Sequence, residues 1–338
     1  MSGGCETTVL PTHTPALFDA AVRQAAALLR AGAVVAVPTE TVYGLAANAL
    51  DPAAVARLFE VKGRPSHNPI IVHVASLEMA RSCAAAWPEP ASRLATAFWP
   101  GPLTIVLPRA AIIPDAVTAG GSTVGLRWPS HPFMQALIRE CGFPLAAPSA
   151  NPSNALSPTN ADHVFRQLGG RIPLVIDGGQ SQVGIESTVI DLAVSPARVL
   201  RPGMVHVESL VAALGVPVLE GGSGKGTLRS PGQLPRHYAP QARLVVLPWA
   251  EEGELRARVA ALGIEPGGCW IVAHAQVPSG AGWAGVSVIP HDAEAYARAL
   301  YAELHRCDEG GVRTIVVQAL PDEPAWRGLA DRLRRASA

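Results

Sequence analysis

Lysine is nearly missing from this 338-residue chain: of its 27 basic residues, only Lys62 and Lys225 are lysines. A lysine ammonium is a compact point charge, unlike the planar guanidinium of arginine, so the lysine at position 62 is compatible with a specific need as well as with chance. Acidic residues also number 27, which makes the formal net charge zero. This balance excludes a polyanion-binding surface that relies on overall charge, but it leaves a local basic groove open.

Cysteines and long apolar runs are also scarce. The five cysteines are odd in number and form no Cys-x-x-Cys pair, which argues against a disulfide framework and against a zinc site. No apolar run reaches the length of about 20 residues that a membrane helix needs. The first residues, MSGGCETTVLPTH, lack the basic-then-apolar order of a signal peptide. We therefore expect a soluble, cytoplasmic protein.

The chain instead concentrates polar chemistry in residues 33–74. Residues 33–37 form a short apolar run that suits a buried strand, and Pro38 ends it because proline cannot donate to a sheet ladder. A polar cluster follows directly and consists of Thr39, Glu40, Thr41 and Tyr43. Because ligands of open α/β sheets bind beyond the ends of strands, this cluster is a candidate binding site.

A helix and a cationic loop come next. Asp51 is typical of a helix N-cap, and the predicted helix runs to about residue 61. Lys62 and Arg64 then flank a glycine, and a second strand is predicted over residues 70–74. Hydroxyl groups, two cations, an amide and a histidine thus converge from strand ends and one loop. That composition is expected of an anion or nucleotide site.

A further strand is predicted over residues 122–127, where Thr123, Gly125 and Arg127 share one face by the period of two. The glycine leaves this face bare between a hydroxyl and a guanidinium, as the close approach of a ligand requires. An edge strand with a solvated arginine explains the same pattern equally well. Residues 144–164 again place small polar groups along a strand that runs into a proline-rich loop.

Composition divides the chain into three parts. Residues 1–214 contain the features above and are the predicted catalytic domain. Residues 215–241 are rich in glycine and proline and form a predicted linker or lid. Within it, residues 224–227 only superficially resemble a P-loop, because no Ser or Thr directly follows Lys225. Residues 242–338 predict a small α/β domain of ordinary size.

An ordered series of motifs resembles the YrdC family of threonylcarbamoyl-AMP synthases. In the first domain these motifs are PTETVYGL (38–45), KGRPSHNPIIVHV (62–74), FWPGPLTIVL (98–107), GLRWPSHP (125–132), APSANPSNALSPT (147–159), GIESTVIDL (184–192) and LRPG (200–203). SPGQLPRHYAP (230–240), followed by a small α/β domain, is similar to the linker of the longer, two-domain members. Those members commonly read SPGMKYRHYAP, so this chain, with Gln233, Leu234 and Pro235, lacks the usual linker lysine.

The resemblance implies an L-threonylcarbamoyladenylate synthase. Such a nucleotidyltransferase joins L-threonine, bicarbonate and ATP into threonylcarbamoyl-AMP and pyrophosphate, and the product is passed to the machinery that modifies adenosine beside the tRNA anticodon. We expect Mg²⁺ to accompany ATP, and no organic cofactor. The implied fold is α/β: a twisted mixed sheet of the YrdC and dihydroxybutanone-phosphate-synthase-like type, then a linker and a small α/β, Rossmann-like C-terminal domain.

The resemblance also implies roles for single residues. Lys62 and Arg64 are the expected catalytic residues, acting by positioning and charge neutralisation, since no covalent nucleophile stands out. The expected contacts of ATP are Lys62, Arg64, Asn68, Thr123, Ser149, Asn151, Ser157, Arg201 and, from a lid, His237 and Tyr238. The expected contacts of threonine are Thr41, His73, Arg127, Ser187 and the backbone of Ala147. Metal ligands are not identified.

Several alternatives stay open. His73 could be an ordinary hydrogen-bonded core histidine, Glu40 and Glu186 could bind magnesium or accept backbone hydrogen bonds, and the linker could be a passive tether. The protein could instead bind double-stranded RNA or the ribosome, which the zero net charge and the few aromatic residues beside basic ones disfavour. It could also form a carbamoyl-adenylate for another pathway, as hydrogenase-maturation proteins with a YrdC-like domain do, although this chain has no acylphosphatase or zinc module.

Overall fold

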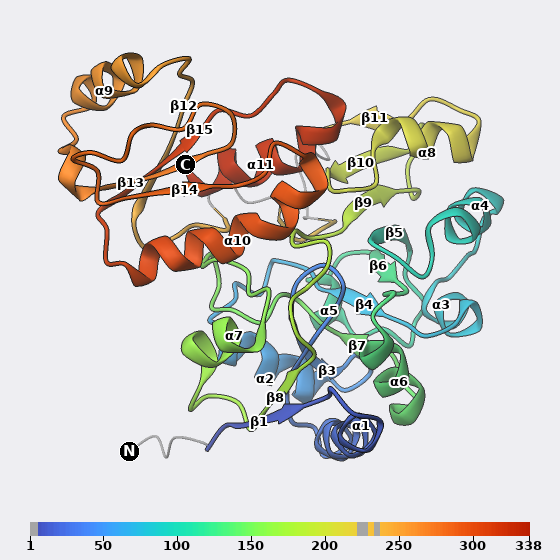
Figure 1. Cartoon of the computed structure of the whole chain (residues 1–338). Coiled ribbons are helices and arrows are strands. Elements are labelled where there is room, and N and C mark those ends of the chain that lie inside the picture. The colour runs from blue at the N-terminus through green and yellow to red at the C-terminus, as the bar shows by residue number, and fades with distance from the viewer. Residues whose placement is uncertain (1–5, 222–228, 233–236) are drawn as a thin grey trace. The chain divides into compact units, whose positions relative to one another are not determined.

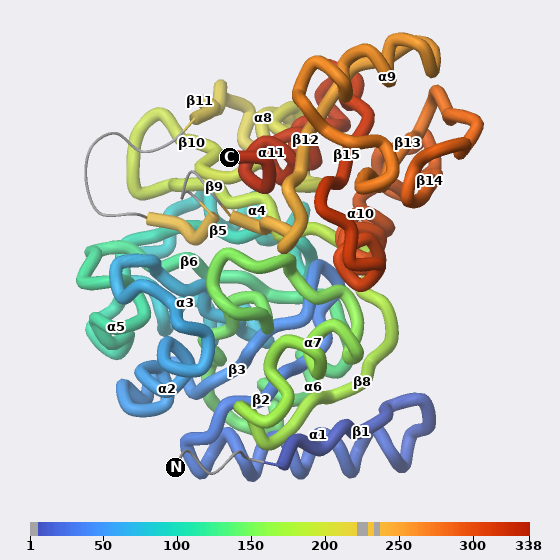
Figure 2. Tube along the Cα trace, turned by 90° about the vertical axis from the view of Figure 1, so that its left-hand side faces the viewer, coloured from blue at the N-terminus to red at the C-terminus, as the bar shows by residue number. Residues whose placement is uncertain are grey.

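The computed structural model describes residues 6–221, 229–232 and 237–338, in two compact units (Figures 1 and 2). The first unit comprises Met1–Ser153 and Ser157–Gln233, and the second comprises Asn154–Leu156 and Leu234–Ala338. Residues 222–228 and 233–236 of the predicted linker, and with them the P-loop-like residues 224–227, lie outside the described residues.

The described part of the first unit contains an 11-stranded mixed sheet with the order β1-β8-β2-β3-β7-β4-β6-β5-β9-β10-β11. In chain order its strands are β1 (Thr8–Pro11), β2 (Val35–Val37), β3 (Gly44–Asn48), β4 (Ile71–His73), β5 (Leu103–Pro108), β6 (Thr123–Arg127), β7 (Leu145–Ala146), β8 (Leu174–Asp177), β9 (Thr188–Asp191), β10 (Arg198–Arg201) and β11 (Leu219–Glu220). This arrangement confirms the predicted mixed α/β fold.

Helices cover both faces of this sheet. They are α1 (Pro15–Arg30), α2 (Pro52–Lys62), α3 (Leu77–Cys83), α4 (Glu89–Phe98), α5 (Asp115–Thr118), α6 (Pro132–Cys141), α7 (Ala161–Leu168) and α8 (Val207–Leu214). The apolar faces of α1 and α6 pack together over β2, β7 and β8. The other helices bury their apolar residues against the opposite face. Helices α1 and α6 therefore cover one part of the sheet, whereas residues of β4, β5, β6 and β9 line a cavity.

Helix positions follow the capping signals closely, whereas short strands escaped prediction. Helix α2 starts after the Asp51 N-cap, whose side chain accepts from Ala53 N, and Gly63 ends it with φ of 58°. Strand β3 was not predicted, because GLAAN has neither alternation nor β-branched residues. The strand expected near residue 145 shrinks to Leu145–Ala146 between two prolines. Strand β11 pairs in parallel with β10, so the sheet extends into the segment predicted as linker.

The described part of the second unit contains a parallel four-stranded sheet, which confirms the predicted α/β class. Its order is β12-β15-β13-β14. Its elements are β12 (Arg243–Leu247), α9 (Glu252–Ala261), η1 (Pro266–Gly268), β13 (Cys269–Ala273), β14 (Gly285–Val288), α10 (Ala293–Glu309), β15 (Thr314–Gln318), η2 (Pro324–Trp326) and α11 (Arg327–Ala336). In Figure 1, α9 lies on one side of this sheet and α10 on the other.

Residues 280–285 of this unit read GAGWAG and match the letters of a dinucleotide-binding fingerprint. They lie between β13 and β14, and they precede a strand instead of opening a helix. The fingerprint works by placing a pyrophosphate at a helix N-terminus after a strand. Because that geometry is absent here, the match carries no functional meaning.

Candidate functional site

Arg127 is the centre of a buried polar cluster in the first unit. It ends β6, beside His73 of the parallel strand β4, and only 4% of it is exposed. Its Nε donates to Gly101 O at 3.3 Å, its Nη1 donates to Thr41 Oγ1 at 2.9 Å, and its Nη2 lies 2.8 Å from Glu40 Oε1. A Cβ at Gly101 would lie 2.4 Å from Phe98 O, so this close turn requires glycine. The guanidinium is thus held from several sides.

Glu40 carries one carboxylate oxygen without a hydrogen-bond partner among the described residues. Its Oε1 accepts from Ser130 N at 3.1 Å, whereas Oε2 is buried and unpaired. Burial favours the neutral carboxyl, but the Arg127 charge and the hydrogen bonds prevail and hold the pKa of Glu40 below its usual value. A buried carboxylate with an open acceptor can receive a hydrogen bond from a bound molecule. The sequence did not assign a substrate contact to Glu40.

His73 lies in the middle of the sheet and is 3% exposed. Burial and the charge of Arg127 hold the pKa of His73 well below its usual value, so the imidazole is neutral at pH 7. Its Nδ1 is buried without a hydrogen-bond partner among the described residues. A core histidine normally has both nitrogens satisfied, because an unpaired buried polar atom costs about 1–3 kcal/mol. Nδ1 is therefore open to a ligand, while backbone hydrogen bonds with Ile71 and Leu145 are those expected of a core histidine.

Lys62 is the last residue of α2 and is 2% exposed. Its ammonium donates to the carbonyl oxygens of Ser149 and Asn151, and it lies 3.4 Å from Asn151 Oδ1. Burial and the nearby charge of Arg64 hold the pKa of Lys62 well below its usual value. Lys62 therefore ties the end of α2 to the loop after β7. Its predicted contact with phosphate groups stays a prediction.

Arg64 and Asn68 shape the loop between α2 and β4. Arg64 donates to the carbonyls of Asn68 at 3.1 Å and of Pro69 at 2.7 Å. The side chain of Asn68 is fully buried, yet neither its Oδ1 nor its Nδ2 has a hydrogen-bond partner among the described residues. An amide left unpaired in the interior is destabilising unless a ligand satisfies it. This observation supports the assignment of Asn68 to the nucleotide site.

Ser187, just before β9, is in contact with Arg201, which ends β10. Arg201 donates through Nε to Ser187 O and through Nη2 to Ser187 Oγ, both at 3.0 Å. The same Oγ lies 2.8 Å from the hydroxyl oxygen of Thr104 in β5. Sequence reasoning missed Thr104, although a fully buried hydroxyl within the apolar run of residues 103–107 was the available signal. Ser187 was predicted to contact threonine and Arg201 to contact ATP. These two residues are therefore in direct contact with each other.

Hydroxyl and carboxylate groups line the remaining strand ends. Ser157 Oγ donates to Glu186 Oε1 at 2.6 Å, and both residues are buried. Ser149 and Thr123 are half-buried, and Ala147 is buried with its N–H bonded to Ile71 O at 3.2 Å. Glu186 thus accepts a hydrogen bond from a side-chain hydroxyl. The two roles considered from the sequence, magnesium binding and acceptance of backbone hydrogen bonds, did not include this contact.

Residues 229–231 of the linker pack against this site within the first unit. Arg229 pairs with buried Asp191 at 3.0 Å, and Arg201 Nη1 donates to Pro231 O at 3.4 Å. Arg229, Ser230 and Pro231 line a narrow cavity together with Ile71, Thr104, Thr123 and Gly125. A Cβ at Gly125 would lie 3.2 Å from Thr104 Cγ2, so the glycine keeps this face bare, as its position in the strand predicted.

The structure places His237 and Tyr238 in the second unit. His237 N donates to Arg335 O at 3.2 Å, and the two rings meet edge to face with centroids 4.0 Å apart. Tyr238 is 1% exposed, has φ of 60°, and lies under the guanidinium of Arg332, which is 5.3 Å from the ring centroid. Their predicted contact with the nucleotide stays a prediction.

Among the described residues, two kinds of feature are absent. No group of three or more His, Cys, Asp or Glu side chains is arranged to hold a metal ion in residues 6–221, 229–232 and 237–338. Within the same ranges, none of the helices is long and apolar enough to cross a membrane.

Comparison with known proteins supplies two family matches. Residues 27–203 match the Sua5_yciO_yrdC family, described as "Telomere recombination", and residues 205–338 match the "Threonylcarbamoyl-AMP synthase, C-terminal domain" family. The chain is 40% identical to a threonylcarbamoyl-AMP synthase of Pyrococcus abyssi over 94% of each chain. It is also 40% identical to one of Bacillus subtilis over 94% of this chain and 93% of the other.

Solved structures show the same likeness over nearly the whole chain. The structure of Pyrococcus abyssi Sua5 with L-threonine has a TM-score of 0.88 at 37% identity, covering 98% of this chain and 97% of that one. A Sua5 variant from the same organism, in which an adjacent His and Tyr are both replaced by alanine, has a TM-score of 0.89 at 37% identity, covering 98% and 96%.

Proposed function

Because the chain belongs to the Sua5/YrdC family, we propose that it is a threonylcarbamoyl-AMP synthase. The ammonium group of threonine first loses a proton, and the free amine then reacts with bicarbonate to give a carbamate and water. The resulting carbamate oxygen attacks the α-phosphorus of ATP, a new P–O bond forms, and pyrophosphate leaves. The observation that carries this proposal is the 40% identity to a named synthase over 94% of each chain, and the buried guanidinium of Arg127, held by Glu40 and Thr41, supports it.

The threonine subsite is assigned to the cluster around Arg127. A guanidinium binds a carboxylate through two parallel hydrogen bonds, and Thr41 and Glu40 hold this guanidinium in place. The neutral His73 and the free oxygen of Glu40 are open for the hydroxyl and amine of the amino acid. The binding of L-threonine by the Sua5 protein of Pyrococcus abyssi supports this assignment.

The nucleotide subsite is assigned to Asn68, Thr123, Ser149, Ser157 and Arg201, with Lys62 and Arg64 as the catalytic cations. Their work is to neutralise the triphosphate and the charge that develops on the leaving pyrophosphate. Mg²⁺ is proposed to enter with ATP, since magnesium is usually held by phosphates, waters and only one or two protein carboxylates. Such a coordination mode does not need a preformed acidic cluster, and the described residues contain none.

The linker is proposed to cover the adenylate. A mixed anhydride hydrolyses readily, so excluding water preserves it until release. Two observations support a cover: Ser230 and Pro231 already line the cavity beside Gly125, and an adjacent His–Tyr pair was the target of substitution in a related Sua5 protein. His237 and Tyr238, an adjacent His–Tyr pair of this linker, are proposed here to reach the nucleotide. The product is proposed to serve a cytoplasmic tRNA-modifying machinery.

Pyrophosphate release tests the reaction. Release from ATP should require both threonine and bicarbonate, and serine should support less of it. Mass spectrometry of the same reaction should detect threonylcarbamoyl-AMP. Equal pyrophosphate release without an amino acid would overturn the proposal, and binding of double-stranded RNA without any adenylate formation would favour the RNA-binding alternative.

A further inference from the structure

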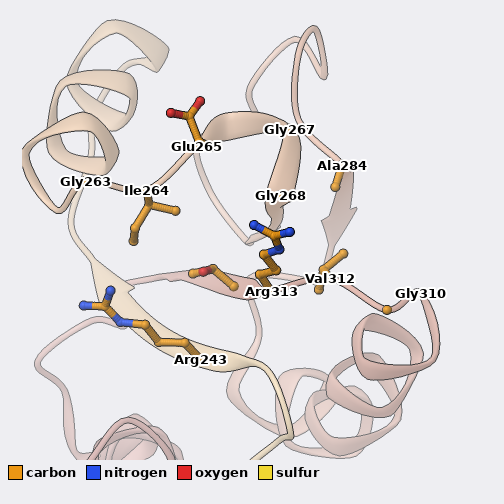
Figure 3. A pocket seen from close by; sticks show the side chains of 12 residues that line it. Arg243, Gly263, Ile264, Glu265, Gly267, Gly268, Ala284, Gly310, Val312 and Arg313 are labelled. Carbon is orange, nitrogen blue, oxygen red and sulfur yellow. The ribbon is translucent and has the colours of Figure 1, made fainter.

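The second unit contains a cleft at the amino ends of its parallel strands (Figure 3). Its volume is about 580 Å³, within the range of about 300–1,000 Å³ that is typical of small-molecule sites. Two loops, residues 263–268 before β13 and 310–313 before β15, form it together with Ala284 and the first residues of β12 and β15. Nothing assigned above to threonine or ATP lies in it.

Two arginines give the cleft its charge. Arg243 and Arg313 begin neighbouring strands, and Arg243 N donates to Arg313 O at 3.0 Å. Both side chains are exposed, and neither guanidinium makes a hydrogen bond or ion pair within the described residues. In Figure 3, Arg313 reaches into the middle of the cleft and Arg243 lies at its side. The register pairs Arg243 with Thr314, so the two arginines are not a cross-strand pair, and each brings a separate positive charge to the lining of the cleft.

The opposing charges at the cleft are weaker. Glu265 is the one acidic residue that lines it, and in Figure 3 its carboxylate points away from both guanidinium groups. The C-terminal ends of α9 and α10 also face this edge, and each carries about half a negative charge. Their last carbonyls, however, are occupied by hydrogen bonds from residues 262–264 and 310–311. Two whole charges on Arg243 and Arg313 therefore dominate the middle of the cleft.

Glycines keep the cleft open. A Cβ added at Gly267 or Gly268 would meet no heavy atom within 4 Å, and neither residue has a positive φ. The space above them is therefore free, and a side chain could enter it without backbone strain. The N–H groups of Gly263, Gly268, Gly310 and Gly311 already bond within their own turns. Recognition at this site therefore depends on the arginines and not on a nest of free backbone N–H groups.

We propose that this cleft binds a small phosphate-bearing anion through Arg243 and Arg313. Guanidinium groups match phosphate oxygens in two parallel hydrogen bonds, and two of them balance the double charge of a phosphate monoester. The cleft is sized for a small molecule, and the zero net charge of the chain disfavours a long polyanion. The site is separate from the synthase reaction and does not depend on it.

Amide NMR of the full-length protein tests the proposal at the site itself. Pyrophosphate and AMP are titrated separately at constant ionic strength, and the amide resonances of Gly268 and Gly311 are followed. Both probes should shift these resonances saturably, whereas adenosine, which lacks phosphate, should not. Because the readout is local, binding at the ATP site does not mimic it.

Variants provide the second part of the test. Arg313→Gln and Arg243→Gln should each weaken binding by about tenfold or more, as expected for loss of a charged hydrogen-bonded contact. Gly267→Leu should block the cleft without backbone strain. Arg258→Gln removes another exposed arginine of the same unit, outside the cleft, and should leave the affinity unchanged. Absence of saturable shifts, equal shifts with adenosine, shifts that survive both arginine substitutions, or a response to RNA alone would each overturn the proposal.

Discussion

The cations of the candidate site in the first unit and those of the cleft in the second are held in opposite ways. In the first unit, Lys62, Arg64, Arg127 and Arg201 are each at most 8% exposed, and each donates to carbonyl or side-chain oxygens. In the second, Arg243 and Arg313 are exposed and have no partner among the described residues. A buried charge is costly unless neighbours satisfy it, so its position is fixed before a substrate arrives. An exposed charge is held by water, which a ligand can displace.

The largest effect is expected where a buried charge loses its partner. Arg127→Ala would leave Glu40 buried beside no cation, which typically costs about 3–5 kcal/mol of unfolding free energy. Threonine affinity should also fall at least tenfold while ATP affinity changes little, as loss of a charge-assisted contact worth about 1.5–3 kcal/mol implies. Urea titration and calorimetry measure these changes, with Arg139→Ala on the exposed side of α6 as control. Loss of ATP affinity instead would assign Arg127 to the nucleotide.

A shape change at Lys62 should have the next largest effect. Lys62→Arg keeps the charge, but the longer, planar group does not fit where one ammonium bonds the carbonyls of Ser149 and Asn151. Overpacking of this kind costs about 1–3 kcal/mol, and turnover should fall because the 149–151 loop is displaced. Steady-state kinetics with both substrates measures this. Full activity of the variant would show that the lysine is incidental.

The charge on Glu40 should make stability depend on acid pH. Its pKa in the folded protein lies below the usual value of 4.5, so its stabilising effect is present above pH 4.5 and is lost as the pH falls through the lowered pKa. The difference in unfolding free energy between the wild type and Glu40→Gln should therefore shrink below pH 4.5. Denaturant titrations at several pH values measure it. A difference that is constant with pH would contradict the charge role.

The smallest effect is expected in the second unit. Arg243→Gln and Arg313→Gln should each change the unfolding free energy by no more than about 0.5 kcal/mol, since both residues are exposed and unpaired. The same denaturant titration measures this. A loss comparable to that of Arg127→Ala would show that these arginines are structural, and it would remove the contrast between the two units.

The sequence alone was enough for the elements with strong local signals and for the family. Helix α2 follows from its Asp51 cap and its glycine stop. The position of Thr41 beyond a strand end followed from Pro38, which ends the preceding strand. The position of Arg127 followed from the period of two in the strand predicted over residues 122–127. These features depend on neighbours within a few residues, so they can be recognised without a fold.

Tertiary structure alone decided which groups meet. The pairing of Glu40 with Arg127 joins residues from two strand ends, and the contacts of Thr104 with Ser187 and of Lys62 with the 149–151 loop join segments distant along the chain. Short strands such as β3 and β11 exist only because neighbours in the sheet supply their hydrogen bonds. The open cleft at Arg243 and Arg313 likewise arises where two loops and the first residues of β12 and β15 come together. Local propensity has no information about such partners, because burial and pairing are set by the whole fold.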